Sequence, residues 1–215
     1  MPKIDSIIFD LDGTLWDASA GVLDAWNDLI QKEGLSMRIS EKQMQGVMGL
    51  GIEDLAAKLF PGLEREERLA LVERCYVAET EYLYDHGAIL YPKLEETLRE
   101  LAREYPLFVV SNCQKNYIEA FYHSHGLGGY FRDRECSGNT GLSKGKNIRL
   151  LADRNHLSHP IYVGDIRGDL RASEEAGIPF LYARYGYGDL TPEEYTYYVD
   201  AFGDLPACLR QITQS

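Results

Sequence analysis

The chain lacks a long apolar stretch, and it carries much less positive than negative charge. No run of apolar residues approaches the roughly 20 residues needed to span a bilayer. The N-terminal segment MPKIDSIIFD becomes acidic at once and has no apolar signal-peptide core. We therefore expect a cytoplasmic protein that does not associate with membranes.

The shortage of positive charge also limits the partners. The sequence holds 22 basic and 34 acidic residues, a formal net charge of −12. Nucleic acid and anionic membrane surfaces would be repelled by such a protein, so neither is expected as a partner. A small anionic substrate is still compatible with this charge, because it responds to the local field of its pocket.

Closely spaced cysteines are absent as well. The four cysteines are scattered along the chain and form no C-x-x-C pair, which argues against a zinc ribbon or a disulfide framework and fits a reducing compartment. They are Cys75, Cys113, Cys136 and Cys208.

The apolar pattern predicts two kinds of structure in the 215 residues. Residues 4–9 are typical of a short buried strand, whereas residues 19–84 show helical spacing and no convincing strand. From residue 91 onward, apolar strand-like segments alternate with helical segments of about ten residues, the pattern of βαβ units. We therefore expect an α/β fold: a doubly wound, Rossmann-like parallel sheet with a small helical cap inserted after the first strand. The core would comprise residues 1–16 and 88–215, and the cap residues 17–87.

Polar side chains follow several of the expected strands. In open α/β sheets, ligands bind outside the carboxyl ends of the strands, so these side chains should meet at one edge. Converging carboxylates need a cation, and Mg²⁺ prefers carboxylate oxygens, water and substrate phosphate. Lysine and serine would add donors for a phosphoryl oxygen, and an aspartate can attack phosphorus itself. The side chains are Asp10 and Asp12, Ser111 and Asn112, Asp165 and Asp169, with Lys144 and Lys146 just before the helix that leads into the strand ahead of Asp165.

Four motifs occur here in a defined order: DLDGTL (10–15), VVSN (109–112), SKG (143–145) and VGDIRGD (163–169). With their strand context, they resemble the haloacid dehalogenase-like hydrolases along the whole chain. The helical insert is similar to the small cap of the branch that includes phosphoglycolate phosphatases and β-phosphoglucomutases. The resemblance implies an enzyme that uses Mg²⁺ and acts on a small phosphorylated metabolite.

The same resemblance implies catalytic roles for three residues. Asp10 would be the nucleophile, and Asp12 would protonate the leaving oxygen and then activate water. Lys144 would neutralise charge beside the nucleophile. Many family members carry a Lys-Pro-x-Pro pattern at the lysine, whereas this chain has Lys-Gly-Lys-Asn. Lys144 is preferred on its similarity to the phosphoserine phosphatase version, and Lys146 stays open.

Binding roles also follow from the resemblance. Ser111 and Asn112 would bind the phosphoryl group, and Thr14 would help by orienting the loop. The metal ion would be held by Asp10, by the backbone carbonyl of Asp12 and by Asp165. Asp169 would bind the ion directly or support another ligand.

The expected function is a Mg²⁺-dependent phosphatase that acts on phosphoglycolate or a sugar phosphate through an aspartyl phosphate. A β-phosphoglucomutase-type mutase is one alternative, although it would want a basic residue on the cap loop at residues 45–51 and this loop has none. Pyrophosphatase activity remains an alternative, as does a non-catalytic binding protein on the same core. Loop 45–51, with its three glycines, is expected to reach the substrate. The oligomeric state is left open.

Overall fold

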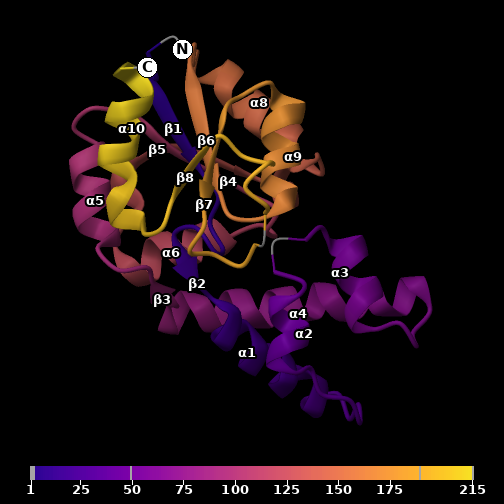
Figure 1. Ribbon diagram of the computed structural model, residues 1–215. Coiled ribbons are helices and arrows are strands. Elements are labelled where there is room, and N and C mark those ends of the chain that lie inside the picture. The colour runs from indigo at the N-terminus through magenta and orange to yellow at the C-terminus, as the bar shows by residue number, and fades with distance from the viewer. Residues whose placement is uncertain (1–2, 49, 189, 215) are drawn as a thin grey trace.

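A six-stranded parallel sheet forms the centre of the computed structural model, which describes residues 3–48, 50–188 and 190–214 (Figure 1). Its strand order is β5-β4-β1-β6-β7-β8, so strands distant in sequence lie side by side. Four of the strands are buried along their whole length, as expected for a parallel sheet covered on both faces. The strands are β1 (Ser6–Phe9), β4 (Leu107–Ser111), β5 (Phe131–Cys136), β6 (Pro160–Gly164), β7 (Phe180–Ala183) and β8 (Tyr197–Val199).

Helices cover both faces of this sheet, which confirms the doubly wound α/β architecture. Apolar residues of α5, α6 and α10 pack with one face, and those of α8 and α9 pack with the other (Figure 1). Period-two alternation sends neighbouring strand residues to opposite faces, so Ile7 and Ile8 belong to different apolar clusters. The core helices are α5 (Leu94–Leu101), α6 (Tyr117–His125), α7 (Ser137–Thr140), α8 (Lys144–Arg154), α9 (Arg167–Ala176) and α10 (Leu205–Gln214), with short 3₁₀ turns at Gly128–Tyr130 and Phe202–Asp204.

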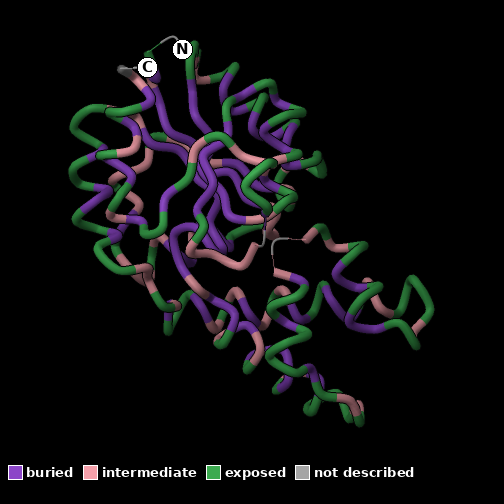
Figure 2. The backbone as a smooth tube through the Cα atoms, viewed as in Figure 1, coloured by how far each residue is buried: buried purple, intermediate pink, exposed green. Residues whose placement is uncertain are grey.

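The predicted helical cap follows β1 and extends away from the sheet. Its buried residues face inward between its helices, and its outer surface is exposed (Figure 2). Trp26 is fully buried and stacks on Phe60, with ring centroids 6.4 Å apart. The cap helices are α1 (Ser19–Lys32), α2 (Glu41–Gln45), α3 (Ile52–Leu59) and α4 (Arg65–His86).

Two short strands join the cap to the core. β2 (Trp16–Asp17) pairs antiparallel with β3 (Ile89–Leu90), so the chain enters and leaves the cap at one place. The sequence pattern did not predict this pair, nor strand β8 or helix α10. From the sequence and from this connection, we propose that the core comprises residues 1–16 and 88–215 and the cap residues 17–87.

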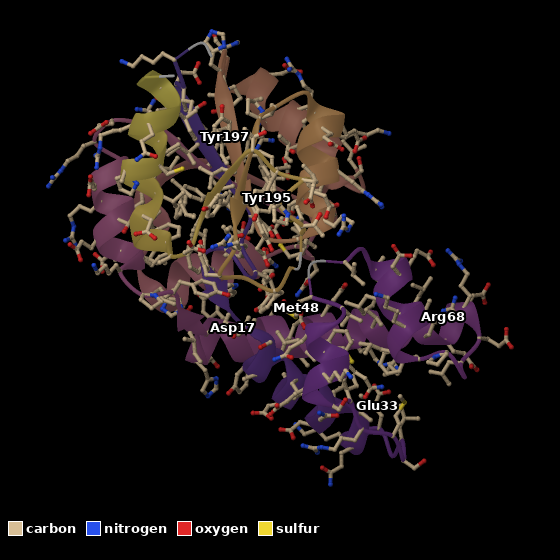
Figure 3. All side chains as sticks on the ribbon, in the orientation of Figure 1. Asp17, Glu33, Met48, Arg68, Tyr195 and Tyr197 are labelled. Carbon is tan, nitrogen blue, oxygen red and sulfur yellow. The ribbon has the colours of Figure 1, made fainter. Side chains whose placement is uncertain are left out.

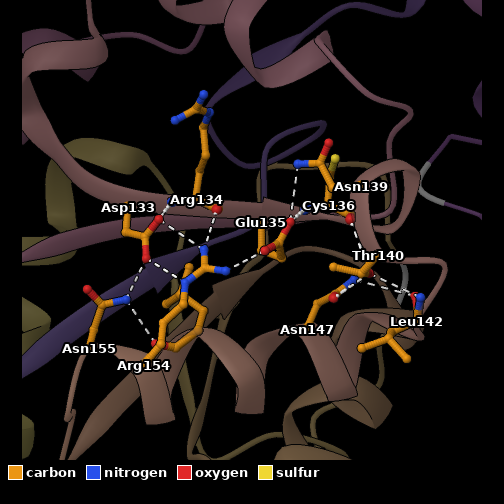
Figure 4. Close-up of polar contacts among 11 residues, drawn as sticks. Asp133, Arg134, Glu135, Cys136, Asn139, Thr140, Leu142, Asn147, Arg154 and Asn155 are labelled. Carbon is orange, nitrogen blue, oxygen red and sulfur yellow. Dashed lines mark hydrogen bonds and ion pairs between the residues drawn. The ribbon is translucent and has the colours of Figure 1, made fainter.

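A polar network fixes helix α8 against strand β5 (Figure 4). The Arg154 guanidinium donates to Asp133 at 2.7 and 2.9 Å and also pairs with Glu135. Nearer the other end of α8, the Thr140 hydroxyl donates to the side-chain carbonyl of Asn147 at 2.7 Å. These contacts hold both ends of the helix that begins at Lys144.

In the part of the chain that the structure describes, no helix has the length and apolar character needed to cross a membrane.

Candidate active site

Three buried carboxylates gather where the central strands end. Asp10 follows β1 and Asp165 follows the neighbouring β6, while Asp169 lies in the first turn of α9. Each can offer one oxygen such that the three oxygens lie within 4.8 Å of one another, and each residue is at most 1% exposed. Like charges at this spacing in a buried place are costly unless a cation or protons compensate.

The ammonium group of Lys144 supplies part of that compensation. Its Nζ donates to Asp10 Oδ1 at 2.9 Å and to Asp169 Oδ1 at 2.6 Å. Burial disfavours the charged lysine, but the adjacent Asp10 and Asp169 carboxylates outweigh this and raise the pKa of Lys144. The Ser143 side chain caps α8 and makes Lys144 its first residue, whereas Lys146 is exposed. Of the two candidate lysines, the structure brings Lys144 to the carboxylates.

Asp10 retains one oxygen without a partner. Its Oδ1 is bound to Lys144, but its Oδ2 is buried and accepts no hydrogen bond. Burial and the charge of Asp169 raise the pKa of Asp10 to about 7, against the opposing effect of Lys144. A buried carboxylate oxygen left unpaired is where a cation or an electrophilic phosphorus atom would bind.

Asp12 makes its hydrogen bonds to residues outside the carboxylate cluster. Its Oδ1 accepts hydrogen bonds from Trp16 Nε1 and from the Tyr117 hydroxyl, both at 2.9 Å. Burial raises the pKa of Asp12 to about 6, although these two hydrogen bonds act to lower it. A carboxyl that titrates near neutral pH can both donate and accept a proton, which suits general acid–base chemistry.

Thr14 binds a carboxylate of the cluster. Its hydroxyl donates to Asp165 Oδ1 at 3.1 Å, so it orients that aspartate. Asp169 Oδ2 accepts the backbone N–H groups of Asp165 and Ile166, both at 3.0 Å. With Oδ1 on Lys144, Asp169 has both oxygens engaged and is placed to support the other ligands.

The segment after β7 also holds Asp165, a role that the sequence pattern did not predict. The Tyr187 backbone N–H donates to Asp165 Oδ2 at 2.8 Å, and the Tyr185 hydroxyl donates to the Thr14 carbonyl at 2.7 Å. A Cβ on Gly186 would lie 2.4 Å from Asp165 Cβ, so only glycine fits there without displacement. From sequence alone, the tyrosines of YARYGYG are typical of packing or surface positions. The only sequence signal for this role was a glycine between two tyrosines at the end of a strand, which is typical of a close approach of the backbone to another group.

Ser111 and Asn112 line a pocket between core and cap. The pocket also contains Asp12 and Tyr117 from the core, and encloses about 40 Å³. Space of this kind holds only a few water-sized groups, so the pocket fits a small leaving group. Asn112 Oδ1 accepts a hydrogen bond from the Ser137 hydroxyl at 3.0 Å, which fixes its amide.

The cap wall of this pocket is mostly apolar. Loop 45–51 lies at this wall: its described residues Val47, Met48 and Leu50 line the pocket, and Met48 lies where the cap meets the core (Figure 3). That the loop contacts the substrate stays a prediction. The second of that loop's three glycines, at position 49, lies outside the described residues. The cap also contributes Glu79 from α4, a buried carboxyl that sequence reasoning did not single out.

The arrangement can be compared with known proteins. A family model described as haloacid dehalogenase-like hydrolase matches residues 7–183. The phosphoglycolate phosphatase of Yersinia pseudotuberculosis is 28% identical over 197 residues, covering 86% of this chain and 82% of its own.

Solved structures agree on the fold. A haloacid dehalogenase-like hydrolase from Streptococcus pneumoniae has a TM-score of 0.81 at 23% identity, covering 95% of this chain and 97% of its own. CbbY from Rhodobacter sphaeroides, in complex with xylulose-1,5-bisphosphate, has a TM-score of 0.77 at 18% identity, covering 94% and 96%. The motif resemblance and the predicted fold are thereby confirmed. This chain is an enzyme that belongs to the haloacid dehalogenase-like hydrolases.

Proposed function

We propose that this protein is a phosphatase that hydrolyses a small phosphomonoester through a phosphoryl group carried on Asp10. One observation carries the proposal: Asp10 is oriented by Lys144 through Oδ1 while its Oδ2 is buried and unpaired. A carboxylate held in this way has lost its water shell and offers a free lone pair, which favours attack on phosphorus.

The carboxylates fit a divalent metal ion, which we propose to be Mg²⁺. Asp10 and Asp165 would hold it with the backbone carbonyl of Asp12, and Asp169 would support them. When bound, the ion would offset the negative charge of the carboxylates and of the phosphoryl oxygens. The three buried carboxylates, which can bring one oxygen each to within 4.8 Å of one another, support this assignment.

The first step would form a bond between an Asp10 oxygen and phosphorus and break the bond between phosphorus and the ester oxygen. Asp12 would give its proton to the departing alkoxide, which leaves as an alcohol. Lys144, Ser111 and Asn112 would bind the transferring phosphoryl oxygens and keep them in line with Asp10.

The second step would return the enzyme to its starting state. Asp12, now a carboxylate, would take a proton from water, and the hydroxyl oxygen would attack phosphorus and release Asp10. Inorganic phosphate and the free alcohol are then the two products. Trp16 and Tyr117 would keep Asp12 oriented through both proton transfers.

The relatives named phosphoglycolate phosphatase suggest phosphoglycolate as a substrate, and a fold relative that binds a sugar bisphosphate suggests sugar phosphates. The small pocket favours a leaving alcohol of a few heavy atoms.

Phosphate release from p-nitrophenyl phosphate and a panel of phosphorylated metabolites tests the proposal. Wild type and Asp10→Asn would each be assayed with Mg²⁺ and with EDTA. We expect Mg²⁺-dependent turnover that falls roughly a thousandfold or more in Asp10→Asn, which keeps the side-chain size but removes the nucleophile. Turnover that persists in the variant would reject Asp10 as the nucleophile.

A further inference from the structure

Glu79 places a carboxyl group inside the apolar cap wall of the pocket. It lies on α4, is 4% exposed and lines the same pocket as Asp12. Its Oε2 accepts a hydrogen bond from Trp26 Nε1, and its Oε1 accepts one from Gln114 Nε2 at 2.7 Å. Both hydrogen bonds favour the ionised form of Glu79, whose remaining lone pairs could accept a donor from a molecule in the pocket.

No positive charge faces this carboxyl. Among the described residues that line the pocket there is neither lysine nor arginine, and the charged groups are Asp12 and Glu79. Burial raises the pKa of Glu79 to about 8, the hydrogen bonds from Trp26 and Gln114 lower it, and the charge of Asp12 adds to the rise. A buried carboxyl without a cation is costly to ionise, so Glu79 holds its proton until a cation from outside the chain pairs with it and stabilises the carboxylate.

The cap side of the approach to the pocket also carries negative charge. A cleft of about 900 Å³ between cap and core shares Tyr76, Asn112 and Gln114 with the pocket. Its core wall contributes Lys115 and Lys144, the latter bound to Asp10. Its cap side contributes four acidic residues, Glu53, Asp54, Glu73 and Glu81. The cap side therefore disfavours an additional negative charge on the leaving group, as the pocket does.

Aromatic rings adjoin Glu79 in the pocket. Trp26 and Tyr76 both line it, with ring centroids 5.9 Å apart and planes inclined at 68°. One face of Trp26 stacks on Phe60 and its N–H donates to Glu79, so the ring holds the carboxylate in the pocket, where it would be the charged acceptor for an ammonium group. Aromatic rings, a carboxylate and apolar side chains form a set suited to an ammonium group on a short carbon chain.

Resting on the proposed phosphatase function, we propose that the substrate is the phosphate ester of a small amino alcohol, whose ammonium group binds Glu79 while its phosphate meets Asp10. The ester would be hydrolysed to inorganic phosphate and the free amino alcohol. A leaving group that bears a carboxylate, as in phosphoglycolate, would instead place its charge beside Asp12 and Glu79. The pocket therefore selects against it.

Three two-carbon phosphate esters that differ at one terminal group test this selection: phosphoethanolamine with an ammonium, 2-hydroxyethyl phosphate with a hydroxyl, and phosphoglycolate with a carboxylate. We expect wild-type kcat/KM to be about tenfold to a hundredfold higher for the ammonium ester than for the hydroxyl ester. The carboxylate ester should be the poorest. If the wild type hydrolysed the carboxylate ester with the same kcat/KM as the ammonium ester, that result alone would overturn the inference.

Glu79→Gln removes the charge while keeping the side-chain shape. The preference for the ammonium ester over the hydroxyl ester should fall toward unity in this variant. Glu67→Gln, an exposed substitution on the same helix outside both cavities, should keep the wild-type preference. An unchanged preference in Glu79→Gln would also overturn the inference.

Each assay would be paired with Asp10→Asn and with p-nitrophenyl phosphate. If no phosphomonoester shows turnover that depends on Asp10, the phosphatase function fails, and the inference fails with it. If turnover depends on Asp10 but the ranking of the three esters is reversed, only the inference fails.

Discussion

Lys144 Nζ bridges Asp10 and Asp169, at 2.9 Å from one carboxylate and 2.6 Å from the other. One ammonium group thus links the end of β1 to the first turn of α9, two segments separated by more than a hundred residues in sequence. The contact fixes one oxygen of Asp10 and leaves the other unpaired. The proposed chemistry depends on this pairing.

Replacing Lys144 by methionine should lower kcat/KM by about a hundredfold to a thousandfold, because a preorganised donor at the phosphoryl site is lost. Lys146→Met is the matched control, since Lys146 lies on the same helix but is exposed. Steady-state phosphate release measures both. Equal activity in the two variants would contradict the role of Lys144.

Gly186→Ala should weaken Mg²⁺ binding by about tenfold to a hundredfold, because the new methyl group would displace Asp165. A Mg²⁺ titration followed by thermal shift and by activity measures the change. Gly129→Ala serves as the control, since a Cβ there meets no atom within 4 Å. Wild-type metal affinity in Gly186→Ala would show that the loop does not position Asp165.

Arg154→Met should reduce the free energy of unfolding by about 1 to 2 kcal/mol, since a partly exposed guanidinium loses its hydrogen bonds to Asp133 and Glu135. Urea unfolding measures the difference. Arg149→Met, on the same helix, removes only an exposed pair with Asp153 and should cost less. Equal losses in both variants would mean that the network in Figure 4 adds nothing to stability.

Metal-free protein should become less stable as the pH rises from about 5 to 7.5. Burial raises the pKa of Asp10 to about 7 and that of Asp12 to about 6, so the folded state holds protons that the unfolded chain has released. Burial lowers the pKa of His125, so this residue makes the protein more stable as the pH rises, opposite to the two aspartates. The contribution of Asp10 to the pH dependence of stability is therefore isolated by comparing wild type with Asp10→Asn.

Thermal unfolding at several pH values, with and without Mg²⁺, measures this effect. The midpoint of the metal-free wild type should fall with pH more than that of Asp10→Asn. Mg²⁺ should stabilise the wild type more at pH 7.5 than at pH 5, because protons compete with the metal at lower pH. Identical pH profiles for the two proteins would refute the assignment of a raised pKa to Asp10.

The sequence predicted those parts of the fold that have a strong local pattern. Buried strands read as continuous apolar runs, and the rule that ligands bind at strand ends predicted Asp10, Ser111 and Asp165 at one edge of the sheet. β8 and the β2–β3 pair escaped prediction because each has three residues or fewer. Their pairing partners are distant in sequence, so local periodicity carries little information about them.

The site was less predictable where tertiary contacts decide the environment of a residue. The sequence favoured Lys144 over Lys146 by resemblance alone, because the local pattern does not show where α8 begins or which of its sides faces Asp10. Glu79 lies in a helix rich in charged residues and resembles a solvent-facing position. Its burial depends on Trp26 and Gln114, which come from other elements.

The most direct test of the central claim is to trap the phosphoryl group on the enzyme. Wild type with Mg²⁺ and a turned-over phosphomonoester would be quenched during turnover and treated with borohydride, which reduces an aspartyl phosphate to homoserine. Peptide mass spectrometry should then find homoserine at position 10, with Asp12 unchanged. Modification at another residue, or steady turnover with no modified enzyme at any quench time, would contradict a phosphoryl intermediate on Asp10.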